Sequence, residues 1–202
     1  MTKRVPIAIL AAFLAFSLLF AACADVYVVV PLRGEWNNGV YTSDYLGLRF
    51  TLPEGWVAAT DDEIAANMGL AADFIDDIGA GLEMPEDMDL LIDMMARSEE
   101  TGANVQVIFE RLPGRGRITE ADYIEEVVRQ MELLGGELNL DFPGTTTLGG
   151  YEFYAYGTEM THFGVVAYGR QFINIQDGFV RLIIITYFEG SETVEEILEM
   201  FS

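Results

Sequence analysis

The feature that most constrains the fold is an apolar run near the C-terminus, Phe-Val-Arg-Leu-Ile-Ile-Ile-Thr-Tyr-Phe at residues 179–188. β-Branched and aromatic residues dominate this run, which favours a β-strand. Because both alternating sets of side chains are largely apolar, the strand should lie in the centre of a sheet that is covered on both faces. The Asp177-Gly178 pair just before it predicts a tight hairpin with a strand over residues 165–176.

Two further patterns predict helices. Apolar residues recur every three or four positions over residues 61–78, where Thr60 and Glu63 have the spacing of a capping box. The same period recurs over residues 119–134, and Gly135-Gly136 ends it. A short helix with Ser191 as its cap closes the chain.

Strand patterns fill most of the remaining chain. Residues 88–97 fit either a strand or a helix, and we prefer a strand, because the Ser-Glu-Glu-Thr-Gly turn that follows would join it to a strand at 105–109 as a hairpin. Other strands are expected over residues 25–30, 40–42, 48–52, 138–142 and 151–160. The sequence therefore predicts an α+β fold, a single domain in which an antiparallel sheet is flanked by helices as an α/β/α sandwich.

The N-terminus has the pattern of an export signal. Lys3 and Arg4 precede an apolar stretch of about 15 residues, and Ala21-Ala22 come directly before Cys23, the one cysteine of the sequence. The segment resembles the signal peptide of bacterial lipoproteins, in which such a cysteine is lipidated and the preceding bond is cleaved. The resemblance implies that acyl chains such as palmitate on Cys23 hold the protein on the extracytoplasmic face of the cell membrane. The alternative is an uncleaved signal anchor in which Cys23 has no special role.

Cleavage before Cys23 divides the chain into three parts. These are a signal peptide over residues 1–22, an anchor-proximal segment over residues 23–36 and a single domain over residues 37–202. The exported part keeps nine basic residues against 33 acidic ones. Phosphate backbones bind proteins through clusters of Lys and Arg, so we expect no nucleic-acid partner.

In the segment from Tyr41 to Trp56, the expected strand over residues 48–52 is followed directly by Pro-Glu-Gly-Trp. This segment, together with the closing hairpin and terminal helix, resembles PsbP-like domains and exported lipoproteins of Gram-positive bacteria. The resemblance implies a compact α/β/α sandwich that binds other proteins and has no shared catalytic centre. It carries over no functional residue, because the matching positions, such as the turn at Gly55, have structural roles.

Few residues of the domain suggest chemistry. His162 is the only histidine, and no serine lies in a Gly-x-Ser-x-Gly motif, so the sequence predicts no zinc site and no serine hydrolase. We expect no catalytic, cofactor-binding or metal-binding residue, although weak divalent-cation binding near residues 83–89 stays open. The candidate partner-binding residues are two tyrosines on one strand face, the histidine and two loop arginines: Tyr154, Tyr156, His162, Arg115 and Arg117. The alternative for the tyrosines is packing under a helix, and for His162 a turn between two strands.

These patterns together predict a lipid-anchored, non-enzymatic envelope lipoprotein whose domain binds an envelope protein or a small ligand. Two alternatives stay open, a carboxylate-dependent hydrolase at the cell surface and an accessory subunit of a membrane complex. The sequence leaves the identity of the ligand and the oligomeric state undetermined.

Replacing Cys23 with serine should release the protein from the membrane fraction without unfolding it, because the thiol carries the acyl chains and lies outside the predicted core. Labelling with an alkyne fatty acid and cell fractionation measure the anchoring, and thermal melting measures the fold. An intact N-terminus and an unmodified thiol in the native protein would contradict this expectation, as would loss of cooperative melting in Cys23→Ser.

Overall fold

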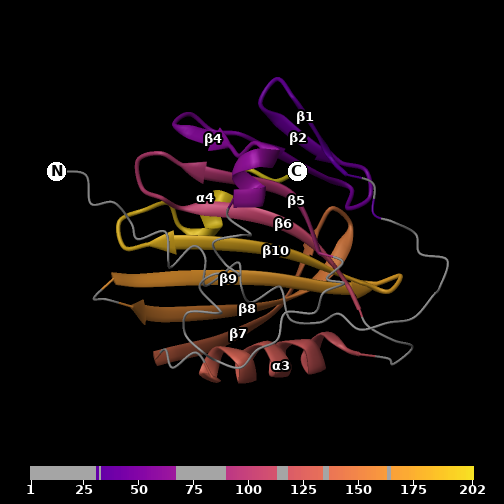
Figure 1. Cartoon of the computed structure of the whole chain (residues 1–202), viewed down its shortest axis with the longest axis vertical. Helices are drawn as coiled ribbons and strands as arrows, with labels where there is room; N and C mark the ends of the chain where they lie inside the picture. The colour runs from indigo at the N-terminus through magenta and orange to yellow at the C-terminus, as the bar shows by residue number, and fades with distance from the viewer. Residues whose placement is uncertain (1–30, 32, 67–89, 113–117, 134–136, 163–164) are drawn as a thin grey trace.

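The computed structural model describes residues 31, 33–66, 90–112, 118–133, 137–162 and 165–202 (Figure 1). Most of these residues form antiparallel strands in two sheets. The small sheet contains β1 (Glu35–Asn37), β2 (Val40–Ser43) and β3 (Leu48–Thr51). The large sheet contains β4 (Trp56–Ala58), β5 (Leu90–Ser98), β6 (Asn104–Arg111), β7 (Glu137–Leu148), β8 (Tyr151–His162), β9 (Val165–Gln176) and β10 (Phe179–Phe188). The described helices are residues 61–66, α3 (Glu120–Leu133) and α4 (Val194–Leu198).

The uniformly apolar strand β10 lies in the middle of the large sheet. The strand order is β4-β5-β6-β10-β9-β8-β7, and every neighbouring pair is antiparallel. Residues 179–186 of β10 are all buried, so the predicted central position and two-sided burial are confirmed. The predicted turn is also confirmed, since Asp177 and Gly178 both have positive φ, at 55° and 81°.

One face of the large sheet packs against α3 and residues 61–66. Alternate β10 side chains point to this face, and they pack with Ile108 of β6 and Ile173 of β9. From the helices, Ile64, Tyr123, Ile124 and Val127 complete the cluster. α3 presents Tyr123, Ile124 and Val127 to the sheet because its apolar positions recur at the helical period.

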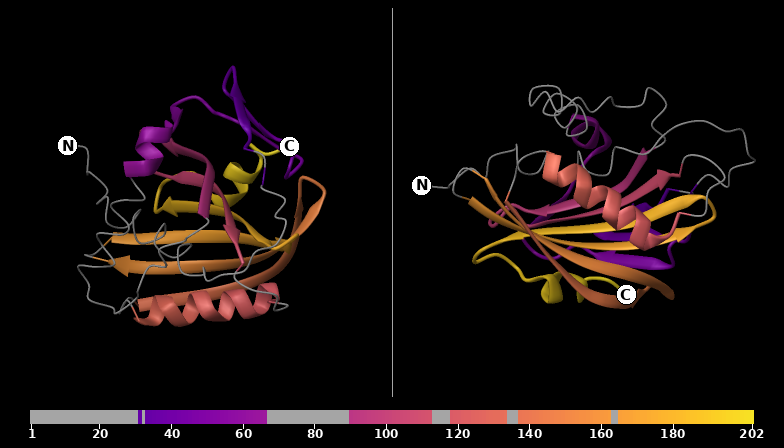
Figure 2. Two further views of the ribbon diagram at one scale, coloured as in Figure 1. Left: turned by 45° about the vertical axis from the view of Figure 1, so that its right-hand side comes forward. Right: turned by 90° about the horizontal axis from the view of Figure 1, so that it is seen from below.

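The opposite face is covered by the three-stranded sheet together with α4, and Figure 2 (right) shows α3 and α4 on opposite sides of the strands. Alternating Leu48 and Phe50 of β3 point inward, as the strand period requires. α4, which is five residues long, adds Val194 and Ile197. The expected α/β/α sandwich is therefore wrong. The fold is β-rich, because a second sheet supplies most of the layer that we had assigned to helices.

The described elements differ from the sequence expectations in several places, and two of them, β1 and β4, form where no strand was expected. β7 runs to Leu148, well beyond the expected end at Phe142, through a bulge between Asp141 and Gly144. The cap of the last helix is Thr193, whose side chain forms a capping box with Glu196. The predicted cap, Ser191, instead bonds to the backbone of Phe188. The expected strand at 25–30, the rest of the 61–78 helix and the acidic segment 83–89 lie outside the described residues.

A buried polar contact joins α3 to the sheet. The Tyr123 hydroxyl donates to Glu110 of β6 at 2.7 Å, and both side chains are buried. Burial raises the pKa of the Glu110 carboxyl to about 8, and the bond from Tyr123 opposes this shift. The carboxyl is therefore protonated in the folded protein around neutral pH.

Trp56→Ala should lower the free energy of unfolding by about 3–5 kcal/mol, the usual cost of deleting a buried large aromatic. The indole is 6% exposed, packs near Phe50 and donates to Glu192 at 2.9 Å. Urea unfolding of the full chain measures the change. Phe142→Ala is the matched control, because that ring is 62% exposed and its removal should be nearly neutral. Equal effects of the two substitutions would contradict the assigned packing.

The native protein should lose stability as the pH rises from about 4.5 to 8, and Glu110→Gln should remove this loss. In the unfolded chain Glu110 ionises near 4.5, whereas the folded protein keeps it protonated until about 8. The stability that this group contributes is therefore complete below pH 4.5 and falls as pH rises through that window. Urea midpoints at pH 5 and pH 8 measure it, with the exposed Glu125→Gln as control. The same pH dependence in Glu110→Gln and the native protein would show that Glu110 is not the cause.

Candidate functional site

A hollow of about 200 Å³ lies over β7, β8, β9 and β10, near the end where β7 and β9 begin. The strand register sets its walls, because residues paired across neighbouring strands point to the same face. Leu140, Thr158 and Gly169 lie between the two rows of wall residues and form the floor. The first row consists of Asp141, Gly157 and Arg170. The second row consists of Asn139, Glu159, Tyr168 and Tyr187.

Gly157 leaves the middle of the first row without a side chain, and the ion pair of its two cross-strand partners occupies that space beside the hollow. Asp141 and Arg170, its partners on the two sides, meet above it with Nη1–Oδ1 and Nη2–Oδ2 distances of 3.3 and 3.4 Å. A Cβ atom at position 157 would overlap the Asp141 carboxylate. The Arg170 side chain is 17% exposed and that of Asp141 is 62% exposed. The buried Arg170 Nε has no hydrogen-bond partner among the described residues.

Two tyrosines form the second wall of the hollow. The rings of Tyr168 and Tyr187 stack with centroids 5.3 Å apart and an angle of 22° between their planes. Both side chains are half-buried. Burial raises the pKa of the Tyr187 hydroxyl, and the nearby Arg170 guanidinium opposes this shift. The hollow thus combines an aromatic wall with the ion pair of Asp141 and Arg170.

A second depression, of about 250 Å³, lies beside Asp93 at a bulge in β5. The Asp93 carboxylate is buried and accepts from the Gly34 N–H at 2.9 and 3.1 Å and from the Tyr41 hydroxyl. Burial raises the pKa of this carboxyl. Gly34 has no room for a side chain, because the Tyr41 ring occupies that space. These contacts hold Gly34, just before β1, and Tyr41 of β2 against β5. Asp93 therefore has a structural role.

Arg181 in β10 is a buried cation on the face that the small sheet covers. Its guanidinium lies between the rings of Tyr45 and Tyr151, 4.4 Å from each centroid. Asp177 is the nearest described carboxylate, at 3.7 Å. The arrangement fastens the β2–β3 turn to the large sheet through two cation–π contacts.

Besides Glu110, five buried polar side chains on the α3 face have an atom without a hydrogen-bond partner among the described residues. None of these residues is more than 4% exposed, so a ligand could reach them only if the core opened. We therefore assign them to the core. They are Asn104, Gln106, Thr158, Gln171 and Thr186.

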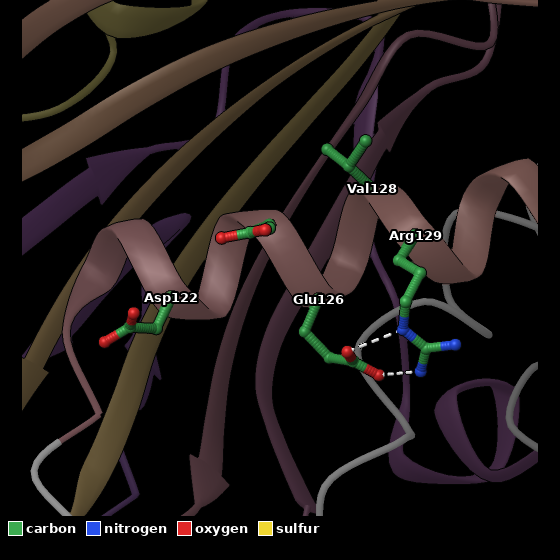
Figure 3. A pocket seen from close by; sticks show the side chains of 5 residues that line it. Asp122, Glu126, Val128 and Arg129 are labelled. Carbon is green, nitrogen blue, oxygen red and sulfur yellow. Dashed lines mark hydrogen bonds and ion pairs between the residues drawn. The ribbon is translucent and has the colours of Figure 1, made fainter.

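A larger depression, of about 480 Å³, borders α3 (Figure 3). All its described lining residues belong to that helix, among them Asp122, Val128 and a pair formed by Glu126 and Arg129. No second described element sends a side chain into it, so its polar groups do not converge. It is a solvated acidic helix face. Within the described residues, no three His, Cys, Asp or Glu side chains are grouped to hold a metal ion.

The structure separates the candidate residues that the sequence suggested. Tyr154 and Tyr156 share the α3 face as expected, and Tyr154 is 43% exposed. Tyr156 is fully buried under α3 and donates to Gln171, so the proposal that it contacts a partner is wrong. His162 ends β8, where it pairs with Val165. Arg115 and Arg117 lie outside the described residues.

No sequence pattern predicted the hollow, which lies on the opposite face from Tyr154. One available signal was Gly157 within an otherwise continuous strand pattern, since a strand glycine often marks the close approach of another group. The cross-strand partners of Gly157 could not be found without the register. Asp141 lies beside a bulge that shifts the pairing of β7.

No protein-family model matches the chain, and no curated protein is significantly similar to it. The fold and the hollow therefore carry the functional argument. Among the helices in the described part of the chain, none has the length and apolar character needed to cross a membrane.

Proposed function

We propose that this chain is a lipid-anchored protein of the cell envelope whose β-rich domain binds a small polar ligand in the hollow above Gly157, without chemical turnover. The leader that ends at Cys23 supports the anchor. The hollow supports the binding role, because it is concave and brings polar and aromatic groups together from four strands. In this proposal the acyl chains provide the membrane contact and the domain is left to bind the ligand.

The observation that carries the proposal is the glycine in the middle of β8. A glycine inside a strand weakens it, because the residue has high conformational entropy in the unfolded chain and no side chain to pack. Here the missing side chain creates the space over which Asp141 and Arg170 meet. The Arg170 side chain is 17% exposed and its partner Asp141 is 62% exposed. The glycine therefore places a cationic donor and an exposed acceptor together at one edge of the hollow, which supports a binding role.

The hydrolase alternative receives less support. Asp93 has a raised pKa in a depression, as a general acid would require. Its oxygens, however, accept bonds from Gly34 and Tyr41, and its side chain is fully buried. Asp141 in the hollow is held by Arg170. Neither carboxylate is placed to exchange a proton with a substrate.

A protein partner is the second candidate, and it draws on exposed aromatic residues of β7 and β8. Tyr154 and Phe142 are the exposed large hydrophobic residues of the described chain, at 43% and 62%. They belong to the neighbouring strands β8 and β7. An accessory subunit of a membrane complex would use such residues, and crosslinking from position 154 in intact cells would detect its partner.

A thermal-shift screen of the full chain in detergent tests the proposed function. The panel should contain small polar molecules that are neutral, anionic or cationic, since a ligand that binds only the folded state raises the melting temperature. At least one class should stabilise the native protein, and Gly157→Ala should abolish that shift by moving Asp141 into the hollow. Asp141→Asn is a second variant that keeps the backbone unchanged, and Thr147→Ala, an exposed β7 residue away from the hollow, is the control. The proposal fails if no compound stabilises the protein, or if both hollow variants respond like the native chain.

A further inference from the structure

The charges around the hollow favour an uncharged ligand. Arg170 and Asp141 form an ion pair, so their charges largely offset each other. Glu159 adds a negative charge nearby, and the chain has a formal net charge of −22, which repels anions. A cationic ligand that bound Asp141 would compete with Arg170 for this carboxylate and leave the mostly buried guanidinium without its partner. A neutral molecule avoids both costs.

The polar groups of the hollow suit hydroxyl groups. Each Arg170 Nη carries a second N–H beyond the one directed at Asp141, and the exposed Asp141 carboxylate can accept further bonds. A hydroxyl both donates and accepts, so two adjacent hydroxyls can accept from Arg170 and donate to Asp141. Asn139 adds an amide whose contact with Glu159, at 3.5 Å, is long and replaceable.

The aromatic wall and the size of the hollow limit the shape of the ligand. Half-buried Tyr168 and Tyr187 present apolar ring surface beside the Asp141–Arg170 ion pair. Apolar C–H groups of a ligand are stabilised by packing on such rings. The volume of about 200 Å³ is below the roughly 300–1,000 Å³ of sites for drug-sized ligands. The hollow therefore accommodates a ligand of about one ring.

A molecule with adjacent hydroxyls on one edge, apolar C–H groups on its faces and no charge is a pyranose sugar. We infer that the hollow binds one neutral pyranose ring, either a monosaccharide or the end residue of an oligosaccharide. This inference rests on the proposed function and names its ligand class. Asp141 and Arg170 bind the hydroxyls, and the tyrosine wall packs against the C–H face of the sugar.

Titration of the full chain with sugars tests the inference. The protein should be kept in a polyoxyethylene detergent, because detergents with sugar head groups would compete for the site. The neutral probes are short oligosaccharides of glucose, galactose, mannose and N-acetylglucosamine, and the charged probes are glucuronate and glucosamine. Saturation-transfer NMR and calorimetry should detect binding of at least one neutral sugar and at least tenfold weaker binding of its charged counterparts.

Substitutions assign that binding to the hollow. Gly157→Ala and Asp141→Asn should each weaken it about tenfold or more, and Tyr168→Leu should weaken it while keeping an apolar side chain in the wall. Thr147→Ala should bind like the native protein. Neutral sugar binding that survives both Gly157→Ala and Asp141→Asn overturns the assignment of the site.

The charged probes separate the two claims. If a charged molecule binds and the hollow variants abolish its binding, the proposed function stands and the sugar inference falls. If neither the sugars nor any compound of the thermal-shift screen binds the folded native protein, both fall. If a neutral sugar binds and loses affinity in the hollow variants alone, both are supported.

Discussion

The structure depends on the burial of β10 from both sides. Leu182 and Ile184 face α3, while Ile183 and Ile185 face the small sheet, and none of these side chains is more than 2% exposed. A strand with this composition is stable only when two separate layers cover the sheet. Helices and a second sheet, formed by segments far apart in the chain, supply those layers.

Buried polar contacts fix each layer, and the hollow lies where the second layer stops. Tyr123 and Glu110 join α3 to β6, while Arg181 joins the β2–β3 turn to β10. Such groups are costly to bury unless their partners are correctly placed, so they favour one arrangement of the layers. Below the small sheet, the apolar cluster includes Phe172 of β9 and Ala155 of β8. The next row, Gly157 and Arg170, is polar and borders the hollow.

Local sequence patterns predicted the strands of the large sheet other than β4, and the position of α3, because each depends on periodicity and turn residues close in the chain. The same patterns could not show what covers the second face. Leu48 and Phe50 indicate an amphipathic strand, but not which layer that strand joins. The hollow was harder still, since Asp141, Gly157 and Arg170 come together only through the register of three strands and a bulge. For Tyr156 the interpretation as packing under a helix is confirmed, whereas alternation alone could not separate it from the exposed Tyr154, because alternation gives the face of a residue and not the extent of its cover.

The central claim is that a rigid sheet, organised around β10, forms the hollow before any ligand arrives. Native-state hydrogen exchange on the full chain tests this claim most directly, at the amides of Gly157, Thr158 and Gly169 in the hollow. If the account is correct, these amides exchange only through global unfolding, with the same free energy as those of β10. Exchange of β8 and β9 through local opening at much lower free energy, while β10 stays protected, would contradict a preformed site.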